Sequence, residues 1–152
     1  MANYDDLFIT TTDTVCGLGG PINSTTLQKI YELKQRPLHK KIMILVGSIE
    51  QARQFKEWNE QADEFALQHW PGPYSVVVND QGFRMPNQQG LIEFLLANGP
   101  MYVTSANISG QTPIDINQAS QVFPQVKKVL NFGTPSGQAS MIYCVETNSW
   151  IR

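Results

Sequence analysis

The residues best suited to chemistry begin directly after the first apolar segment, in a run rich in hydroxyl groups and glycine. Residues 10–20 contain four threonines, Asp13, Cys16 and three glycines. Glycines let a backbone approach a ligand closely, and neighbouring hydroxyls can hydrogen-bond the oxygens of a phosphate or carboxylate. The run has neither the Gly-Lys-Ser/Thr ending of a Walker loop nor the glycine spacing of a dinucleotide-binding fingerprint. It therefore indicates either an anion-binding loop or an ordinary strand-to-helix connection.

A cluster of cationic side chains follows this run. Five of the eleven Lys and Arg residues fall within residues 29–41, where Glu32 is the only carboxylate. A cationic helix end is common because it complements the helix dipole. The stretch Lys34-Gln35-Arg36-Pro37 also continues past the expected helix end into a loop fixed by proline. Such a fork of Lys and Arg suits a polyphosphate or an RNA backbone.

Three later segments place polar side chains next to predicted strands. Residues 104–110, Thr-Ser-Ala-Asn-Ile-Ser-Gly, directly follow a buried strand, the position at which open α/β sheets bind ligands. Residues 135–140 form a similar small, polar approach to a later strand. Arg84 lies just before Pro86, where a lone arginine is usually a surface residue unless a carboxylate substrate needs a bidentate partner. These loops could converge on one anionic small molecule.

The remaining reactive residue types indicate packing rather than catalysis. Cys16 and Cys144 are predicted to be small buried apolar residues, and they are too few for a disulfide scaffold or a four-ligand zinc site. His69 is expected to pack on its helix, His39 to belong to the basic loop, and Trp70 to form a stiff packing corner. No nucleophile with an adjacent base and no carboxylate pair is visible. The sequence therefore predicts no protein nucleophile and no metal ligands.

The apolar pattern behind these motifs alternates between short strands and medium-length helices. Ser24 and Ser48 are the expected N-caps of two helices, and Pro37 ends the first of them. No linker, repeat or composition shift divides the chain, so we expect residues 1–152 to form one α/β or mixed α+β domain. Strands are predicted at residues 7–11, 42–46, 74–78, 101–104, 128–132 and 141–145, with a short segment around Phe83 after the third of them, and helices at 24–34, 48–55, 59–69, 87–97 and 117–123.

Composition narrows the class of protein. The chain has 152 residues, of which 41% are hydrophobic and 16% charged, which is enough apolar material for a core. A net charge of -2 excludes a generally basic, nucleic-acid-coating protein but leaves room for a local basic patch. The N-terminal residues lack the features of a signal peptide, and no apolar run is long enough to span a bilayer. We therefore expect a reduced, cytoplasmic protein that does not contact a membrane.

Five motifs taken together resemble the YrdC family, whose members are threonylcarbamoyl-AMP synthases. Each motif is weak by itself, but all five occur in the family's order, and the resemblance covers residues 7–152. The motifs are Thr12-Asp13-Thr14-Val15-Cys16-Gly17-Leu18-Gly19, Lys34-Gln35-Arg36-Pro37, Trp70-Pro71-Gly72-Pro73, Arg84-Met85-Pro86 and Thr104-Ser105-Ala106-Asn107-Ile108-Ser109-Gly110.

The resemblance implies a fold and a reaction. The fold is a twisted, mixed β-sheet flanked by helices around a concave, positively charged cavity. The enzyme is a nucleotidyltransferase that converts L-threonine, bicarbonate or CO2, and ATP into threonylcarbamoyl-AMP and pyrophosphate, with Mg²⁺ accompanying the ATP. This is the first step of tRNA threonylcarbamoyladenosine modification, so the implied partners are the downstream tRNA threonylcarbamoyl transferase machinery and possibly tRNA or double-stranded RNA itself.

The resemblance also implies roles for individual residues, all of them in binding, since the reaction needs no protein nucleophile. Two anionic reactants must be brought together, and cationic side chains offset their repulsion. A guanidinium at position 84 can take the threonine carboxylate bidentately. The implied threonine-binding residues are Thr14, Arg84, Ser105 and Ser140, and the implied ATP-binding residues are Lys34, Arg36, Lys40, Ser75, Asn107 and Arg152.

The chain departs from the family pattern at several positions. The family usually has Pro at Thr11, Tyr at Cys16 and Pro at Lys41. Loss of the aromatic ring at Cys16 would loosen one wall of the threonine pocket. Both ends are short relative to the family, and Arg152 is the last residue, where a frayed end would hold a ligand poorly.

Two alternative functions follow from the same residues. The basic run at residues 29–41 is compatible with a non-catalytic module that binds double-stranded RNA or tRNA, although the net charge of -2 and the scarcity of aromatic residues for stacking oppose it. The family's hydrogenase-maturation relatives transfer carbamoyl groups, but they carry acylphosphatase and zinc-finger domains that 152 residues and two cysteines cannot supply.

Overall fold

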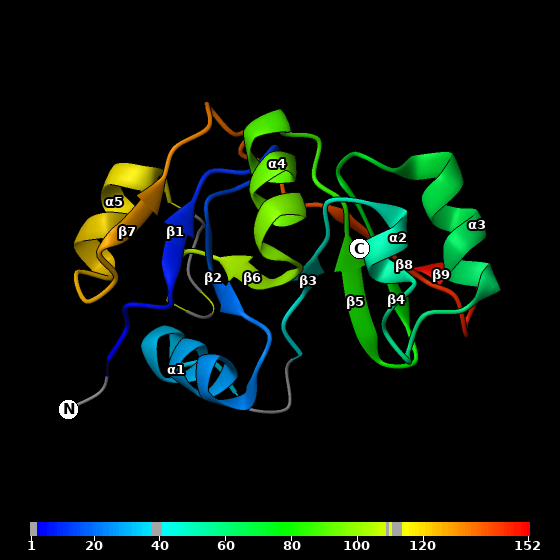
Figure 1. Ribbon diagram of the computed structural model, residues 1–152, viewed down its shortest axis with the longest axis horizontal. Coiled ribbons are helices and arrows are strands. Elements are labelled where there is room, and N and C mark those ends of the chain that lie inside the picture. Colours follow the sequence, from blue (N-terminus) through cyan, green and yellow to red (C-terminus); the bar gives the residue numbers. More distant parts are fainter. Residues whose placement is uncertain (1–2, 38–40, 109, 111–113) are drawn as a thin grey trace.

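The computed structural model describes residues 3–37, 41–108, 110 and 114–152. Within these residues, nine strands form one sheet in the order β7-β1-β2-β6-β3-β5-β4-β8-β9 (Figure 1). The strands are β1 (Phe8–Thr10), β2 (Gly17–Pro21), β3 (Ile44–Leu45), β4 (Tyr74–Val78), β5 (Gln81–Arg84), β6 (Met101–Ser105), β7 (Lys128–Leu130), β8 (Met141–Cys144) and β9 (Ser149–Trp150).

The sheet is mixed, as the resemblance implied. Strand β1 runs parallel to β7, β3 parallel to β5 and β4 parallel to β8, whereas the other neighbouring strands are antiparallel. Helix α5 packs beside β1 at one end of the sheet, and α2 and α3 lie near β4 at the other (Figure 1). The helices are α1 (Ser24–Lys34), α2 (Ile49–Ala52), α3 (Glu60–His69), α4 (Gln89–Asn98) and α5 (Ile116–Val122).

Helix ends follow local side-chain chemistry, with one correction to the expected caps. Ser48 caps α2 as predicted, but this helix ends at Ala52 instead of residue 55. The cap of α1 is Asn23, whose side chain accepts a hydrogen bond of 2.8 Å from the backbone N–H of Thr26, so the prediction of Ser24 was wrong by one residue. Gln35 takes the left-handed conformation (φ 55°) and ends α1 before Pro37 is reached.

The glycine-rich run at residues 10–20 is only partly a loop. Its second half forms strand β2, between β1 and β6, where sequence analysis expected no strand. A Cβ atom on Gly17 would lie 2.5 Å from Cγ1 of Val103, and one on Gly19 would collide with the Tyr102 carbonyl oxygen. These glycines therefore permit close packing of strands, and the part of the run that lines the cavity extends from Thr12 to Gly17 at the start of β2.

Other predicted elements agree in type and differ in length. Residues 42–46 contain a strand of only two residues, β3, and the strand β9 was not predicted. Trp70 is a packing corner as expected, because its indole N–H donates to the Tyr74 carbonyl oxygen at 2.8 Å and its ring lies against Trp58. Among the described helices, none is both long enough and apolar enough to cross a membrane.

Candidate functional site

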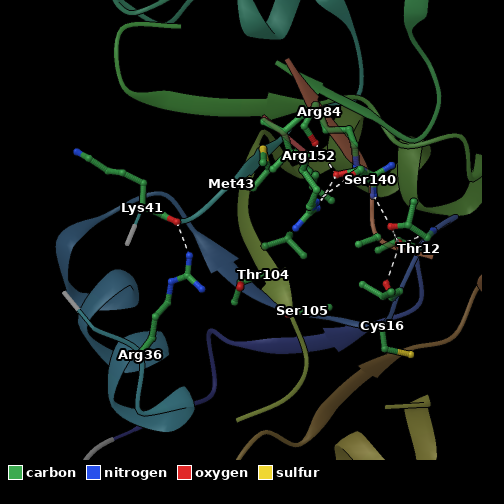
Figure 2. A pocket seen from close by; sticks show the side chains of 18 residues that line it. Thr12, Cys16, Arg36, Lys41, Met43, Arg84, Thr104, Ser105, Ser140 and Arg152 are labelled. Carbon is green, nitrogen blue, oxygen red and sulfur yellow. Dashed lines mark hydrogen bonds between the residues drawn. The ribbon is translucent and has the colours of Figure 1, made fainter. Parts of the chain in front are cut away.

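A cavity of about 310 Å³ opens beside the centre of the sheet, where the loop before β2, the end of β6 and the approach to β8 meet. Figure 2 shows Arg36 and Lys41 on one side of it, with Arg84, Arg152 and Ser140 on the other. Its lining residues are Thr12, Thr14, Val15, Cys16, Gly17, Arg36, Lys41, Met43, Leu45, Ser75, Arg84, Val103, Thr104, Ser105, Ala139, Ser140, Ile142 and Arg152.

Arg84 is the most firmly held cation of the cavity. Only 4% of this residue is exposed, and it lies at the end of β5. Its Nη1 donates to Oδ1 of Asp13 at 2.7 Å and to the Gly72 carbonyl oxygen at 3.0 Å, and its Nη2 donates to the Thr14 hydroxyl at 3.0 Å. These bonds fix the plane of the guanidinium, so the group is positioned before any ligand arrives.

Asp13 connects this arginine to two further segments. Its Oδ2 accepts a hydrogen bond of 2.9 Å from the backbone N–H of Asn87, and its carbonyl oxygen accepts one of 3.1 Å from Ser136. The adjacent Thr14 carbonyl accepts a bond of 2.7 Å from Gly137. The loop that holds Asp13 and Thr14 is thereby hydrogen-bonded to the segment after β5 and to the segment before β8, both of which are distant in sequence. Asp13 was not among the predicted site residues.

A chain of polar contacts links the hydroxyls of the cavity to the last residue. Ser75 and Ser140 lie with their Oγ atoms 2.8 Å apart, because β4 and β8 are parallel neighbours. Arg152 donates from Nε to the Ser140 carbonyl oxygen at 2.7 Å and from Nη2 to its hydroxyl at 3.2 Å. Burial, together with the nearby charge of Arg84, lowers the pKa of Arg152. In this structure the Arg152 side chain is held at the cavity by its two bonds to Ser140.

Lys34 lies behind the cavity wall. It is only 1% exposed, and its Nζ donates to the Thr104 hydroxyl at 3.0 Å, to the Ser105 carbonyl oxygen at 2.6 Å and to the Ser105 hydroxyl at 3.3 Å. Burial, with a contribution from the charge of Arg36, lowers the pKa of Lys34 to about 8. In this structure Lys34 supports the Ser105 loop and is not a lining residue.

The second basic residue of the motif does line the cavity. Arg36 donates from Nη2 to the Lys41 carbonyl oxygen at 2.7 Å (Figure 2), and burial lowers its pKa. Lys41 also lines the cavity, although it was not predicted; the basic run at residues 29–41 was the only signal for it. The predicted Lys40, and His39 beside it, fall outside the described residues.

Asn107 lies at the turn that follows β6 and is not a lining residue. It is 5% exposed, and its Nδ2 donates to the Ile108 carbonyl oxygen at 2.9 Å. Its backbone N–H donates to the Ser105 carbonyl oxygen at 3.0 Å, which makes the turn tight. The structure therefore brings Thr14, Ser75, Arg84, Ser105, Ser140, Arg36 and Arg152 into one cavity and places Lys34 and Asn107 in the layer behind it.

The predictions of a buried Cys16 and a packed His69 agree with the structure, whereas Cys144 is only partly buried and His39 falls outside the described residues. Cys16 is 2% exposed, and burial raises the pKa of its thiol above the ordinary value, as does the charge of Asp115. The thiol is therefore protonated at neutral pH and unsuited to nucleophilic attack. His69 stacks on Phe65 with a ring separation of 4.1 Å. Within the described residues, no group of three or more His, Cys, Asp or Glu side chains could hold a metal ion.

Comparison with known proteins gives the family. A family model for Sua5, YciO and YrdC proteins, described as telomere recombination, matches residues 2–151, so the chain belongs to this family. A threonylcarbamoyl-AMP synthase of Klebsiella pneumoniae is 31% identical over 121 residues, which are 67% of this chain and 64% of the synthase. The uncharacterized protein MG259 of Mycoplasma genitalium is 30% identical over 155 residues, which are 95% of this chain and 31% of that protein.

Solved structures share the fold. A P. abyssi Sua5 structure complexed with L-threonine superposes with a TM-score of 0.81 at 26% identity, covering 91% of this chain and 47% of that one. The E. coli YciO structure superposes with a TM-score of 0.83 at 17% identity, a likeness of fold alone, over 97% of this chain and 82% of that one. The chain thus spans about a third of the Mycoplasma relative and about half of Sua5.

Proposed function

We propose that this protein makes threonylcarbamoyl-AMP and pyrophosphate from L-threonine, bicarbonate or CO2, and ATP. The observation that carries the proposal is the cavity itself, which is lined by three arginines. Two of them lie on one side of it, where Arg84 donates to the Thr14 hydroxyl and Arg152 to the Ser140 hydroxyl. An amino-acid carboxylate and a polyphosphate are the two anions that such a pair could hold side by side. The Sua5 structure complexed with L-threonine supports threonine as one of these anions, and the name of the Klebsiella synthase supports the proposed product.

The threonine half of the site is assigned to the Arg84 side. The described bonds use both Nη1 hydrogens and one Nη2 hydrogen of Arg84, and a guanidinium has five N–H donors. Among the described residues, no bond uses the Nε hydrogen or the second Nη2 hydrogen, so we assign these two donors to the threonine carboxylate. The hydroxyls of Thr14, Ser105 and Ser140 surround the same cavity and can read the amine and the side-chain hydroxyl of threonine.

The ATP half is assigned to Arg36 and Arg152, with Ser75 beside Ser140 and with Lys34 and Asn107 shaping the Ser105 loop from behind. Lys40 belongs to this proposal through the family resemblance. No carboxylate lines the cavity and the described residues offer no metal cluster, so a protein-held metal does not fit. Mg²⁺ enters the proposal as part of the substrate, bound to ATP phosphates and water, which is its usual mode in phosphate sites.

The proposed chemistry is a displacement at phosphorus. The threonine amine adds to CO2 and loses a proton, giving a carbamate. A carbamate oxygen then forms a bond to the α-phosphorus of ATP as the bond from that phosphorus to the bridging oxygen breaks, and pyrophosphate leaves. The side chains bind, orient and offset charge, and such positioning supplies much of the catalysis in phosphoryl and nucleotidyl transfer. The product would feed the tRNA threonylcarbamoyl transferase machinery in the cytoplasm.

The deciding experiment measures pyrophosphate release from MgATP with purified protein. We expect release only when L-threonine and bicarbonate are both present, and loss of release in Arg84→Gln, whose neutral side chain cannot pair with a carboxylate. Glu60→Gln, on the exposed start of α3, is the matched control and should behave as the unaltered protein does.

Release that is indifferent to threonine would contradict the proposal. So would an absence of release combined with threonine-independent, salt-sensitive binding of double-stranded RNA, which would favour the RNA-binding alternative instead.

A further inference from the structure

Five aromatic rings gather at the end of the sheet that carries the last strand. This aromatic cluster comes from α3, β4, β8 and β9, and Trp150 lies within ring-contact distance of every other member, with centroid separations between 5.2 and 6.2 Å. None of the five residues lines the cavity. The cluster consists of Phe65, His69, Tyr74, Tyr143 and Trp150.

The strand that carries Trp150 has little else to hold it. Strand β9 contains two residues, pairs only with β8 and forms an edge of the sheet. Beyond this strand, the backbone N–H of Ile151 donates to the Ile142 carbonyl oxygen at 2.8 Å. The backbone N–H of Ile142 donates to the Arg152 carbonyl oxygen at 3.0 Å. A short hairpin held by a few exposed hydrogen bonds is marginal in water. Aromatic pairs stabilise packing beyond the burial of their apolar area, so the cluster adds stability that the short hairpin lacks.

Arg152 depends on such an anchor because the bonds that the described structure gives its side chain at the cavity go to a single residue, Ser140. It follows Trp150 by two residues, and its guanidinium hydrogen-bonds Ser140 at the wall that Arg84 also faces (Figure 2). The partners that the structure gives this guanidinium are the neutral oxygens of Ser140. The ion pair with Asp13 offsets part of the charge of Arg84, so the position of the Arg152 guanidinium depends on its bonds to Ser140 and on the backbone that carries it.

We propose that Trp150 is a positioning residue, which anchors β9 on the aromatic cluster and thereby holds the Arg152 guanidinium at the cavity, ready for the polyphosphate of a nucleoside triphosphate. The identity of this ligand rests on the proposed function. The anchoring itself is a property of the ligand-free protein and can be tested separately.

The first experiment measures the dissociation constant of MgATP by calorimetry. Trp150→Ala and Arg152→Ala should each weaken binding by about tenfold, which is the loss of one charge-assisted contact. The double variant should bind no more weakly than Arg152→Ala, because both changes remove the same contact. Ile151, which lies between Trp150 and Arg152, is 60% exposed. The Ile151→Ala variant is therefore the control and should bind MgATP as the unaltered protein does.

The second experiment follows amide hydrogen exchange at Ile151 and Arg152 without ligand. Exchange should accelerate in Trp150→Ala and remain unchanged in Ile151→Ala. If Trp150→Ala does not fold, Trp150→Leu keeps an apolar side chain, removes the aromatic contacts and takes its place in both experiments.

Either of two results would contradict the proposed anchoring role of Trp150. One is an unchanged rate of amide exchange at Ile151 and Arg152 in the Trp150 variant. The other is a double variant whose loss of MgATP affinity equals the product of the losses in the two single variants. If the unaltered protein binds no MgATP, the proposed function fails, and the exchange experiment still decides whether Trp150 anchors the strand.

Discussion

At the scale of single residues, the Asp13–Arg84 ion pair determines how the cavity is built. Its side chains are 13% and 5% exposed, with an N–O distance of 2.7 Å. The chain offers a comparison at the surface, where Arg53 and Asp63 pair at 2.8 Å with side chains 48% and 22% exposed. The two pairs are nearly equal in length but differ in their access to water, and the surface pair uses both Nε and Nη2 of Arg53 whereas the buried pair uses Nη1 of Arg84.

This contrast gives a prediction for stability. Asp13→Asn should lower the free energy of unfolding by about 3 kcal/mol, because it leaves a buried guanidinium without its counter-charge. Asp63→Asn should cost less than about 1 kcal/mol, since water replaces an exposed partner. Urea unfolding of both variants measures the difference. Equal losses of unfolding free energy in the two variants would contradict the prediction that burial makes the Asp13–Arg84 pair more costly to break.

At the scale of elements, helix α1 positions the two basic residues of the site. Lys34 is its last residue and Arg36 follows its C-cap. The beginning of the helix depends on Asn23, whose side chain satisfies the backbone N–H of Thr26, and not on the exposed Ser24 beside it. A capping side chain satisfies a backbone donor that the helix itself leaves without a partner.

The two neighbouring residues therefore make a matched pair for a test. Asn23→Ala should destabilise the protein by about 1 kcal/mol, the usual cost of losing an N-cap side chain. Ser24→Ala should be neutral or slightly stabilising, because alanine has the higher helix propensity. Thermal unfolding of both variants measures the difference in stability. A larger loss of stability in Ser24→Ala than in Asn23→Ala would mean that Ser24 is the N-cap.

At the scale of the whole molecule, the buried Lys34 couples global stability to pH. Burial lowers the pKa of Lys34 to about 8 in the folded protein, whereas a lysine in the unfolded chain has a pKa of about 10.4. Between these two pH values the unfolded state therefore binds more protons than the folded state. Stability from this residue therefore rises with pH through that window. Below it, Lys34 is charged in both states and the full cost of burying the charge is present.

The expected outcome is a difference between variants. From pH 7.5 to 9.5, the free energy of unfolding should rise by about 2 kcal/mol more in the unaltered protein than in Lys34→Met, at about 1.36 kcal/mol per pKa unit. Lys56→Met removes an exposed lysine as the control and should retain the pH dependence of the unaltered protein. Identical pH profiles for all three proteins would contradict a buried, readily deprotonated Lys34.

The sequence by itself determined the features that depend on neighbouring residues. Periodicity and local capping chemistry predicted the presence and type of all five described helices, and the five motifs identified the family from residue types in order. Caps and turns form within a few residues of one another, so a pattern of side chains is enough to predict them. The errors at this level, such as Asn23 in place of Ser24, are shifts of a residue or a few.

Only the tertiary structure decided the contacts between distant segments. Residues 17–21 became a strand because β1 and β6 lie on either side of them, and Asp13 met Arg84 across 71 positions of sequence. Lys34 turned inward to the Ser105 loop, again 71 positions away. Strand pairing and buried charge pairing gain their free energy from partners that only the folded chain brings together, and no local pattern of residues encodes which partner that will be.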